Sequence, residues 1–100
     1  MYRHIFIGVI KENTEEEKIT ARIEALKLLK EKVPVVVNLT VGRNLKWYNN
    51  EETIILVGDF QNREDWTAFV NSEYHQQLNS VASEVFDLNR LTAYQFELEK

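Results

Sequence analysis

The sequence predicts an α+β fold of the ferredoxin-like type, with the element order βαββαβ and a four-stranded antiparallel sheet that carries its helices on one face. Two observations predict this fold. Stretches rich in β-branched and aromatic residues mark four candidate strands, at residues 2–11, 35–41, 53–60 and 86–98. Stretches with helical periodicity lie between them, at residues 14–33, 63–70 and 72–85. The pattern fills 100 residues, so we expect a single domain over residues 1–100.

Local signals support each helix in order. Thr14 is expected to cap the first helix, with Glu17 completing a capping box three residues later. Apolar residues then recur on one side of this helix, and Pro34 ends it. In the second half of the chain, Asn62 and Ser72 are the expected N-caps of the two helical pieces. Each helical segment therefore has a capping residue at its predicted start.

The strands are apolar on both faces, although an antiparallel sheet with one face in water normally alternates apolar and polar residues. In the first strand, Phe6 and Ile10 lie on one side. The apolar residues on the opposite side are Ile5, Ile7 and Val9. Two helices cover only one face, and a large exposed apolar patch is rare on a monomer. We therefore expect a homodimer with Ile5, Ile7 and Val9 at its interface. The alternative is a monomer whose strands simply contain many β-forming residues.

Composition argues against several classes of protein. The formal net charge is −4, whereas nucleic-acid-binding domains concentrate lysine and arginine on one face. The same balance gives no reason to expect a membrane surface as partner, and no apolar run approaches the length of a membrane span. The chain has no cysteine, which removes thiol chemistry and favours the reducing cytoplasm. With only two histidines, no metal or other cofactor is expected.

Several short motifs occur in a specific order. They are His4 at the start of an apolar strand, the leucine-rich segment 24–30 before Val33-Pro34, Val41-Gly42-Arg43-Asn44 after the second strand, Asp59-Phe60 at the end of the third, and the spacing from Phe69 to His75. Together they resemble the stress-responsive dimeric A/B barrel family over nearly the whole chain. The resemblance implies ferredoxin-like protomers whose sheets pair in a dimer. Most members of that family have no assigned activity.

One plant branch of the family cyclises a linear polyketide without a cofactor, and related barrels include cofactor-free monooxygenases. The resemblance implies that His4 and His75 match the two histidines of the plant branch. Phe69 and Leu26 stand where that branch carries tyrosines, and Ala93 stands in place of an aspartate that would orient the first histidine. The resemblance to heme-degrading barrels is weaker, because the first strand has no asparagine.

The predicted site is a cavity for a small apolar or aromatic molecule between the helices and the sheet, lined by His4, Phe6, Leu26, Phe69 and His75. Gly8 is expected to widen this cavity because it lacks a side chain. No reaction is assigned. The alternative function is a cofactor-independent enzyme of the polyketide cyclase or monooxygenase type, with His75 as the catalytic acid or base, because histidine titrates near neutral pH. Alternatively, both histidines make only structural hydrogen bonds.

Two further aromatic pairs leave alternatives open. Trp66 and Phe69 lie three residues apart on a predicted helix, where they either join the core or stack on a ligand. Trp47 and Tyr48 lie in the predicted loop 45–52. They pack on their own domain, close the mouth of the barrel, or contact the partner subunit.

Overall fold

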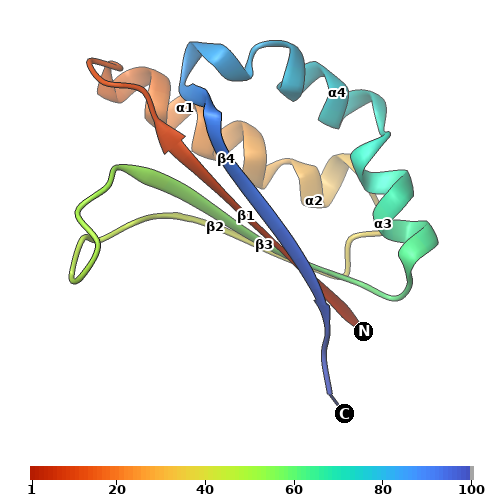
Figure 1. Cartoon of the computed structure of the whole chain (residues 1–100). Coiled ribbons are helices and arrows are strands. Elements are labelled where there is room, and N and C mark those ends of the chain that lie inside the picture. The colour runs from red at the N-terminus through yellow and green to blue at the C-terminus, as the bar shows by residue number, and fades with distance from the viewer. Residues whose placement is uncertain (100) are drawn as a thin grey trace.

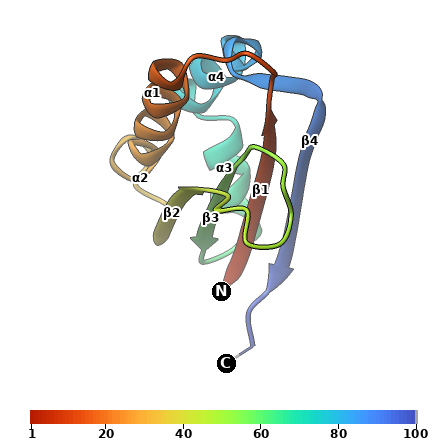
Figure 2. The same cartoon turned by 90° about the vertical axis from the view of Figure 1, so that its left-hand side faces the viewer.

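The computed structural model describes residues 1–99 and has the predicted ferredoxin-like architecture. Its four strands are β1 (Tyr2–Ile10), β2 (Asn38–Arg43), β3 (Thr53–Phe60) and β4 (Phe86–Glu97). Its helical elements are α1 (Glu16–Lys27), α2 (Leu29–Lys32), α3 (Arg63–Val70), α4 (Glu73–Ser80) and the 3-10 helix η1 (Ala82–Glu84). The strands pair antiparallel in the order β2-β3-β1-β4, and the helices lie on one face of the sheet (Figure 1, Figure 2). None of the described helices combines the length and apolar character needed to cross a membrane.

Both predicted caps in the second half of the chain are confirmed. Asn62 Oδ1 accepts a hydrogen bond of 2.8 Å from the backbone N–H of Asp65 at the start of α3. Ser72 Oγ accepts one of 3.2 Å from the backbone N–H of His75 at the start of α4. Each side chain satisfies one of the backbone donors that a helix leaves free in its first turn. The cap at Ser72 also holds the backbone of His75 in the first turn of α4.

The first helical segment differs from its prediction. The Thr14 hydroxyl donates a hydrogen bond of 2.8 Å to the carbonyl of Lys11, so it stabilises the preceding turn. Helix α1 consequently begins at Glu16 without a side-chain cap, and the predicted capping box is wrong. The segment also divides at Leu28 into α1 and α2. The last predicted helix ends at Ser80, and η1 completes that segment.

The second strand begins at Asn38, three residues later than predicted. Val36 is 1% exposed but lies in the turn between α2 and β2. Its side chain fills the core without strand pairing. The β-branched composition of this stretch therefore predicted its burial correctly, but it placed the start of the strand too early in the sequence.

The hydrophobic core lies between the sheet and the helices. Residues of β1 and β3 alternate between the two faces of the sheet, so that every second side chain points to the helices. The largest fully buried side chains are Phe60, Phe69, Leu29, Ile54 and Val36. Burial of each such side chain contributes about 1.5–3 kcal/mol relative to exposure in water. This packed layer fixes the positions of the helices on the sheet, and with them the residues of the candidate site.

The opposite face of the sheet, which we call the open face, is covered by none of the described helices (Figure 1). At one end, loop residues Asn44, Asn49 and Glu51 line a pocket together with Ile7, Val9 and Ile55. The large apolar residues of the open face are Ile5, Ile7 and Val9 of β1, Ile55 and Val57 of β3, and Tyr94 and Phe96 of β4. Those of β1 and β3 are half-buried, and those of β4 are exposed. Ile5, Ile7 and Val9 thus lie where the alternation of the strand predicts, and their place in an interface stays a prediction.

Candidate functional site

A cavity of about 80 Å³, which we call the inner cavity, lies between the helices and the sheet. All five residues predicted to contact a ligand line it: His4 and Phe6 from β1, Leu26 from α1, Phe69 from α3 and His75 from α4. The other lining residues are Arg22, Leu29, Leu56, Leu78, Asn79, Ala82, Phe86 and Leu91. The fold therefore brings these side chains together, and the binding of a ligand by them stays a prediction.

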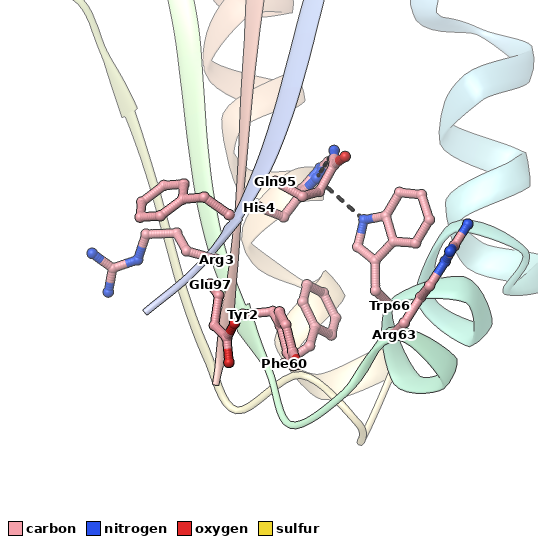
Figure 3. Close-up of a pocket in the computed structure, with 9 residues that line it drawn as sticks. Tyr2, Arg3, His4, Phe60, Arg63, Trp66, Gln95 and Glu97 are labelled. Carbon is pink, nitrogen blue, oxygen red and sulfur yellow. Dashed lines mark hydrogen bonds between the residues drawn. The ribbon is translucent and has the colours of Figure 1, made fainter. Parts of the chain in front are cut away.

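His4 is buried near the start of β1, where two side chains reach one of its ring nitrogens. Its Nδ1 lies 3.2 Å from the indole Nε1 of Trp66 on α3. The same atom lies 3.0 Å from the amide Nε2 of Gln95, the residue opposite His4 on β4. Figure 3 shows the three side chains converging from the two strands and the helix. Burial lowers the pKa of His4 to about 4, with a smaller contribution from the nearby His75. His4 is therefore uncharged at neutral pH.

His75 lies in the first turn of α4 and is half-buried. Its Nδ1 is buried and has no hydrogen-bond partner within the described part of the chain. Burial lowers the pKa of His75, an effect that its own backbone partly offsets. The ring of Phe69 lies between the two histidines, with its centroid 6.0 Å from that of His4 and 5.0 Å from that of His75. Two uncharged imidazoles thus flank one phenylalanine on the cavity wall.

The register of β4 corrects one expectation that came from the family resemblance. Ala93 lies opposite Phe6, whereas the residue opposite His4 is Gln95. The position on the last strand that orients His4 is therefore occupied by an amide that can hydrogen-bond to it. The first-strand histidine is not left without an orienting group, although that group is neutral where the plant branch carries an aspartate.

Gly8 also has a different role from the one expected. A side-chain carbon at Gly8 would lie 2.6 Å from the ring of Phe86 and 2.9 Å from that of Phe6, which is too close for any real contact. The missing side chain therefore lets the two phenylalanine rings meet edge to face, with their centroids 5.6 Å apart. Gly8 allows the core to close at this point and does not widen the inner cavity.

Arg22 of α1 is a cavity residue that the sequence patterns did not single out. Its guanidinium donates hydrogen bonds of 3.1 Å to the Leu78 carbonyl and 3.0 Å to the Val81 carbonyl, at the C-terminal end of α4. It also lies over the ring of Phe86, 5.8 Å from the centroid. A cation is favoured at this end of a helix. Its position three residues after the buried Ile19, on the apolar side of the helix, is the signal that could have identified it.

A second cavity, of about 390 Å³, also adjoins His4, and we call it the outer cavity (Figure 3). It is lined by Tyr2, Arg3, His4, Phe60, Arg63, Trp66, Gln95, Phe96 and Glu97. Of the described residues, His4 is the one that lines both cavities. Phe69 is buried in the core, as one of its alternatives predicted, whereas Trp66 is half-buried with its indole nitrogen directed at His4.

The polar groups around the two cavities are two imidazoles, three guanidinium groups, two amides, an indole N–H, a phenol hydroxyl and one carboxylate, that of Glu97. Among the residues that the structure describes, no three histidine, aspartate or glutamate side chains are grouped as metal ligands would be. An uncharged imidazole can hydrogen-bond to a bound molecule or accept a proton from it. The arrangement is therefore suited to holding a small molecule and to exchanging a proton with it.

The aromatic residues of the β2–β3 loop lie away from both cavities. Trp47 is 90% exposed and Tyr48 is 98% exposed. The expectation that they pack on their own domain is therefore wrong. The loop is held instead by polar contacts, in which the Asn44 amide donates hydrogen bonds of 2.9 Å to the carbonyls of Asn49 and Glu51. Closure of the barrel mouth and contact with a partner subunit remain as alternatives for these aromatic side chains.

Residues 2–97 match the family model described as the Stress responsive A/B Barrel Domain. No curated protein matches the chain. A dimeric protein of unknown function with a ferredoxin-like fold, from Bacteroides fragilis, is 19% identical over 97% of this chain and 95% of that chain, with a TM-score of 0.82. The hydroxynitrile lyase from Passiflora edulis is 14% identical over 99% and 94% of the two chains, with a TM-score of 0.84. An antibiotic biosynthesis monooxygenase is 14% identical over 100% of both chains, with a TM-score of 0.76. Such low identities establish similarity of fold alone.

Proposed function

The chain belongs to the stress-responsive A/B barrel domain family, and we propose that it forms a homodimer in which each protomer binds a small apolar or aromatic molecule in its inner cavity. The observation that carries this proposal is the buried Nδ1 of His75, which has no hydrogen-bond partner among the described residues. A buried polar atom without a partner costs about 1–3 kcal/mol. A bound molecule with a hydroxyl or carbonyl group close to this nitrogen would reduce that cost.

The lining of the inner cavity defines the class of ligand. Small-molecule sites are typically apolar, with a few polar groups that fix the orientation of the ligand. Here Phe6, Leu26 and Phe69 supply apolar surface. The polar groups of the lining are those of His4, His75, Arg22 and Asn79. A volume of about 80 Å³ limits the ligand to a small molecule of at most one ring. No cofactor forms part of the proposal.

The homodimer part of the proposal is supported by the open face. A continuous apolar surface across β1, β3 and β4 is unusual on a monomer. Two copies related by a two-fold axis would bury the same patch on both, with Ile5, Ile7 and Val9 at its centre. The similar protein from Bacteroides fragilis is described as dimeric. We place the dimer in the cytoplasm, which the cysteine-free composition favours.

Titration of phenol and related phenolic compounds into ¹⁵N-labelled protein tests the proposal. We expect saturable shifts of the backbone amides around the inner cavity, and loss of those shifts in His75→Ala while the dimer stays intact. Gln76→Ala is the matched control, because Gln76 is the exposed neighbour of His75 on the same helix. A broad panel of phenolic compounds that shifts neither the amide signals nor the melting temperature would contradict the binding proposal.

A second candidate function is a cofactor-independent enzyme in which His75 moves a proton of the bound molecule. The observation that favours it is the lowered pKa of both histidines, because an uncharged imidazole is available as a base at neutral pH. Structures with a similar fold include a hydroxynitrile lyase and an antibiotic biosynthesis monooxygenase. This similarity is one of fold, so it assigns no reaction to this chain.

Proton exchange at the methyl group of acetophenone in D₂O tests this second candidate. In the proposed step, His75 removes a proton from the carbon next to the carbonyl, and the resulting enolate then takes a deuteron from the imidazole or solvent. We expect exchange faster than in buffer alone, lost in His75→Ala and retained in Gln76→Ala. Equal exchange in wild type and buffer would eliminate the enzyme and leave the binding proposal standing.

A further inference from the structure

The hydrogen bonds of His4 define which of its nitrogens carries the proton. The indole N–H of Trp66 can only donate a hydrogen bond, and it is directed at His4 Nδ1 from 3.2 Å. That nitrogen must therefore present its lone pair. The amide nitrogen of Gln95, 3.0 Å from the same atom, is then a second donor to it. A neutral imidazole has one N–H, so the proton of His4 lies on Nε2.

The Nε2 atom of His4 is the ring nitrogen that remains free to hydrogen-bond to a bound molecule. It makes no hydrogen bond within the described chain. It is also not completely buried, because the one fully buried side-chain nitrogen or oxygen of the described chain that lacks a partner is Nδ1 of His75. Trp66 and Gln95 line the outer cavity and not the inner one, whereas His4 lines both. Both donors thus belong to the wall of the outer cavity (Figure 3).

We propose that Trp66 and Gln95 are positioning residues that hold His4 with its proton on Nε2, so that the inner cavity binds apolar molecules carrying an oxygen acceptor, such as a ketone or a hydroxyl group. This inference rests on the proposed function and specifies the ligand of the same site. The physical reason is directional. A histidine that is free to change tautomer can donate or accept, whereas one fixed by two donors at Nδ1 can only donate from Nε2.

The tautomer can be measured without any ligand. Long-range ¹H–¹⁵N correlation spectra distinguish a protonated ring nitrogen from an unprotonated one. In wild type we expect a single form of His4, with Nε2 protonated and Nδ1 unprotonated. A His4 ring with its proton on Nδ1, or an equal mixture of both forms, would overturn the inference.

Variants of the two donors show whether they cause that preference. We expect Trp66→Phe to give a mixture of tautomers of His4, and Gln95→Leu to give a smaller change in the same direction. Gln95 is exposed on β4, so Gln95→Leu keeps the test usable if Trp66→Phe fails to fold. Tyr2→Phe is the matched control, because it removes one hydroxyl from the same outer cavity without touching His4 Nδ1. Unchanged tautomers in both donor variants would overturn the positioning role.

A matched pair of probes tests the ligand class. Cyclohexanone and methylenecyclohexane have the same ring and nearly the same shape, and differ by an oxygen in place of CH₂. We expect cyclohexanone to bind about 3- to 10-fold more tightly, the range that one neutral hydrogen bond typically gives. In Trp66→Phe that preference should shrink.

The possible outcomes separate this inference from the proposed function. If both probes bind the wild type equally well, the acceptor preference is wrong, and binding in the inner cavity stands. If neither probe nor any phenolic compound binds, the proposed function fails and this ligand class fails with it. If cyclohexanone is preferred equally by wild type and Trp66→Phe, the preference is real but Trp66 does not cause it, which also overturns the inference.

Discussion

The two faces of the sheet are both apolar, but only one of them is covered. On the helix side, Phe60, Ile54 and Phe69 are at most 1% exposed. On the open face, Ile7 is half-buried and Phe96 is 47% exposed. Apolar and aromatic residues on the two sides of the same sheet therefore differ strongly in burial. The helix side forms a complete core that contains the inner cavity, whereas the open face stays partly in contact with water within one chain.

This difference separates folding from assembly. Side chains on the helix side stabilise the protomer directly, because their burial is complete in one chain. Side chains on the open face contribute their remaining burial only when a second surface covers them. Substitutions on the helix side should thus change the stability of the protomer, and substitutions on the open face should change its association.

The largest effect is expected for a core aromatic residue next to the cavity. Phe69→Ala should lower the free energy of unfolding by about 3–5 kcal/mol, because it removes buried surface and leaves a larger void. Phe96→Ala, the same substitution on the open face, should lower it by less than about 1 kcal/mol in the monomer. Urea unfolding at low protein concentration measures both. Equal losses at the two positions would contradict the division between the faces.

The next effect concerns assembly. Ile7→Asp should dissociate the proposed homodimer, because an unpaired charge buried in an apolar interface costs several kcal/mol. Sedimentation equilibrium should then give a mass near the 11.8 kDa of one chain, with the circular dichroism of the folded protomer retained. Thr20→Asp, on the exposed side of α1, is the control and should stay dimeric. A dimer that survives Ile7→Asp would place the interface elsewhere.

The features of the fold that follow from short spacings could be predicted from the sequence. Alternation along β1 places His4 and Phe6 on the helix side, because the period of a strand is two residues. The caps at Asn62 and Ser72 involve hydrogen bonds across three residues, so the sequence contains both partners close together. The second strand was predicted to start too early, because Val36 buries its apolar side chain while its backbone lies in the connection before β2.

The contacts that define the site depend on longer distances and could not be predicted in the same way. Trp66 reaches His4 from 62 residues away, through the position of α3 on the sheet. The pairing of β1 with β4 shifts its register between Gly8 and Ile10. The residue opposite His4 follows from the strand pairing in the structure, which places Gln95 there. The family resemblance had assigned Ala93 to the orienting position.

A pH titration should reveal the histidines of the covered face. The pKa of His4 is about 4 in the folded protein, against about 6.5 in an unfolded chain. Between these pH values the unfolded chain binds a proton that folded His4 does not, so the free energy of unfolding falls as the pH is lowered. The lowered pKa of His75 acts in the same direction. The slope for one group is at most about 1.4 kcal/mol per pH unit.

Urea unfolding measured from neutral pH down to about pH 4 checks this dependence. The free energy of unfolding should begin to fall as the pH drops below about 6.5. His4→Gln should reduce the slope, because glutamine does not titrate, and the remaining slope should come from His75. A stability that is independent of pH over this range in the wild type would mean that the histidines are not held uncharged by burial.

The smallest effect is expected in the β2–β3 loop. Trp47 is 90% exposed, so Trp47→Ala should change the unfolding free energy of the monomer by less than about 0.5 kcal/mol. The measurement is sharpest in an Ile7→Asp background, where association contributes nothing. A loss above about 1 kcal/mol there would mean that the indole packs on its own domain after all. A loss that occurs only in the otherwise wild-type protein would instead assign Trp47 to the interface, because the partner is then the only surface left for this side chain to contact.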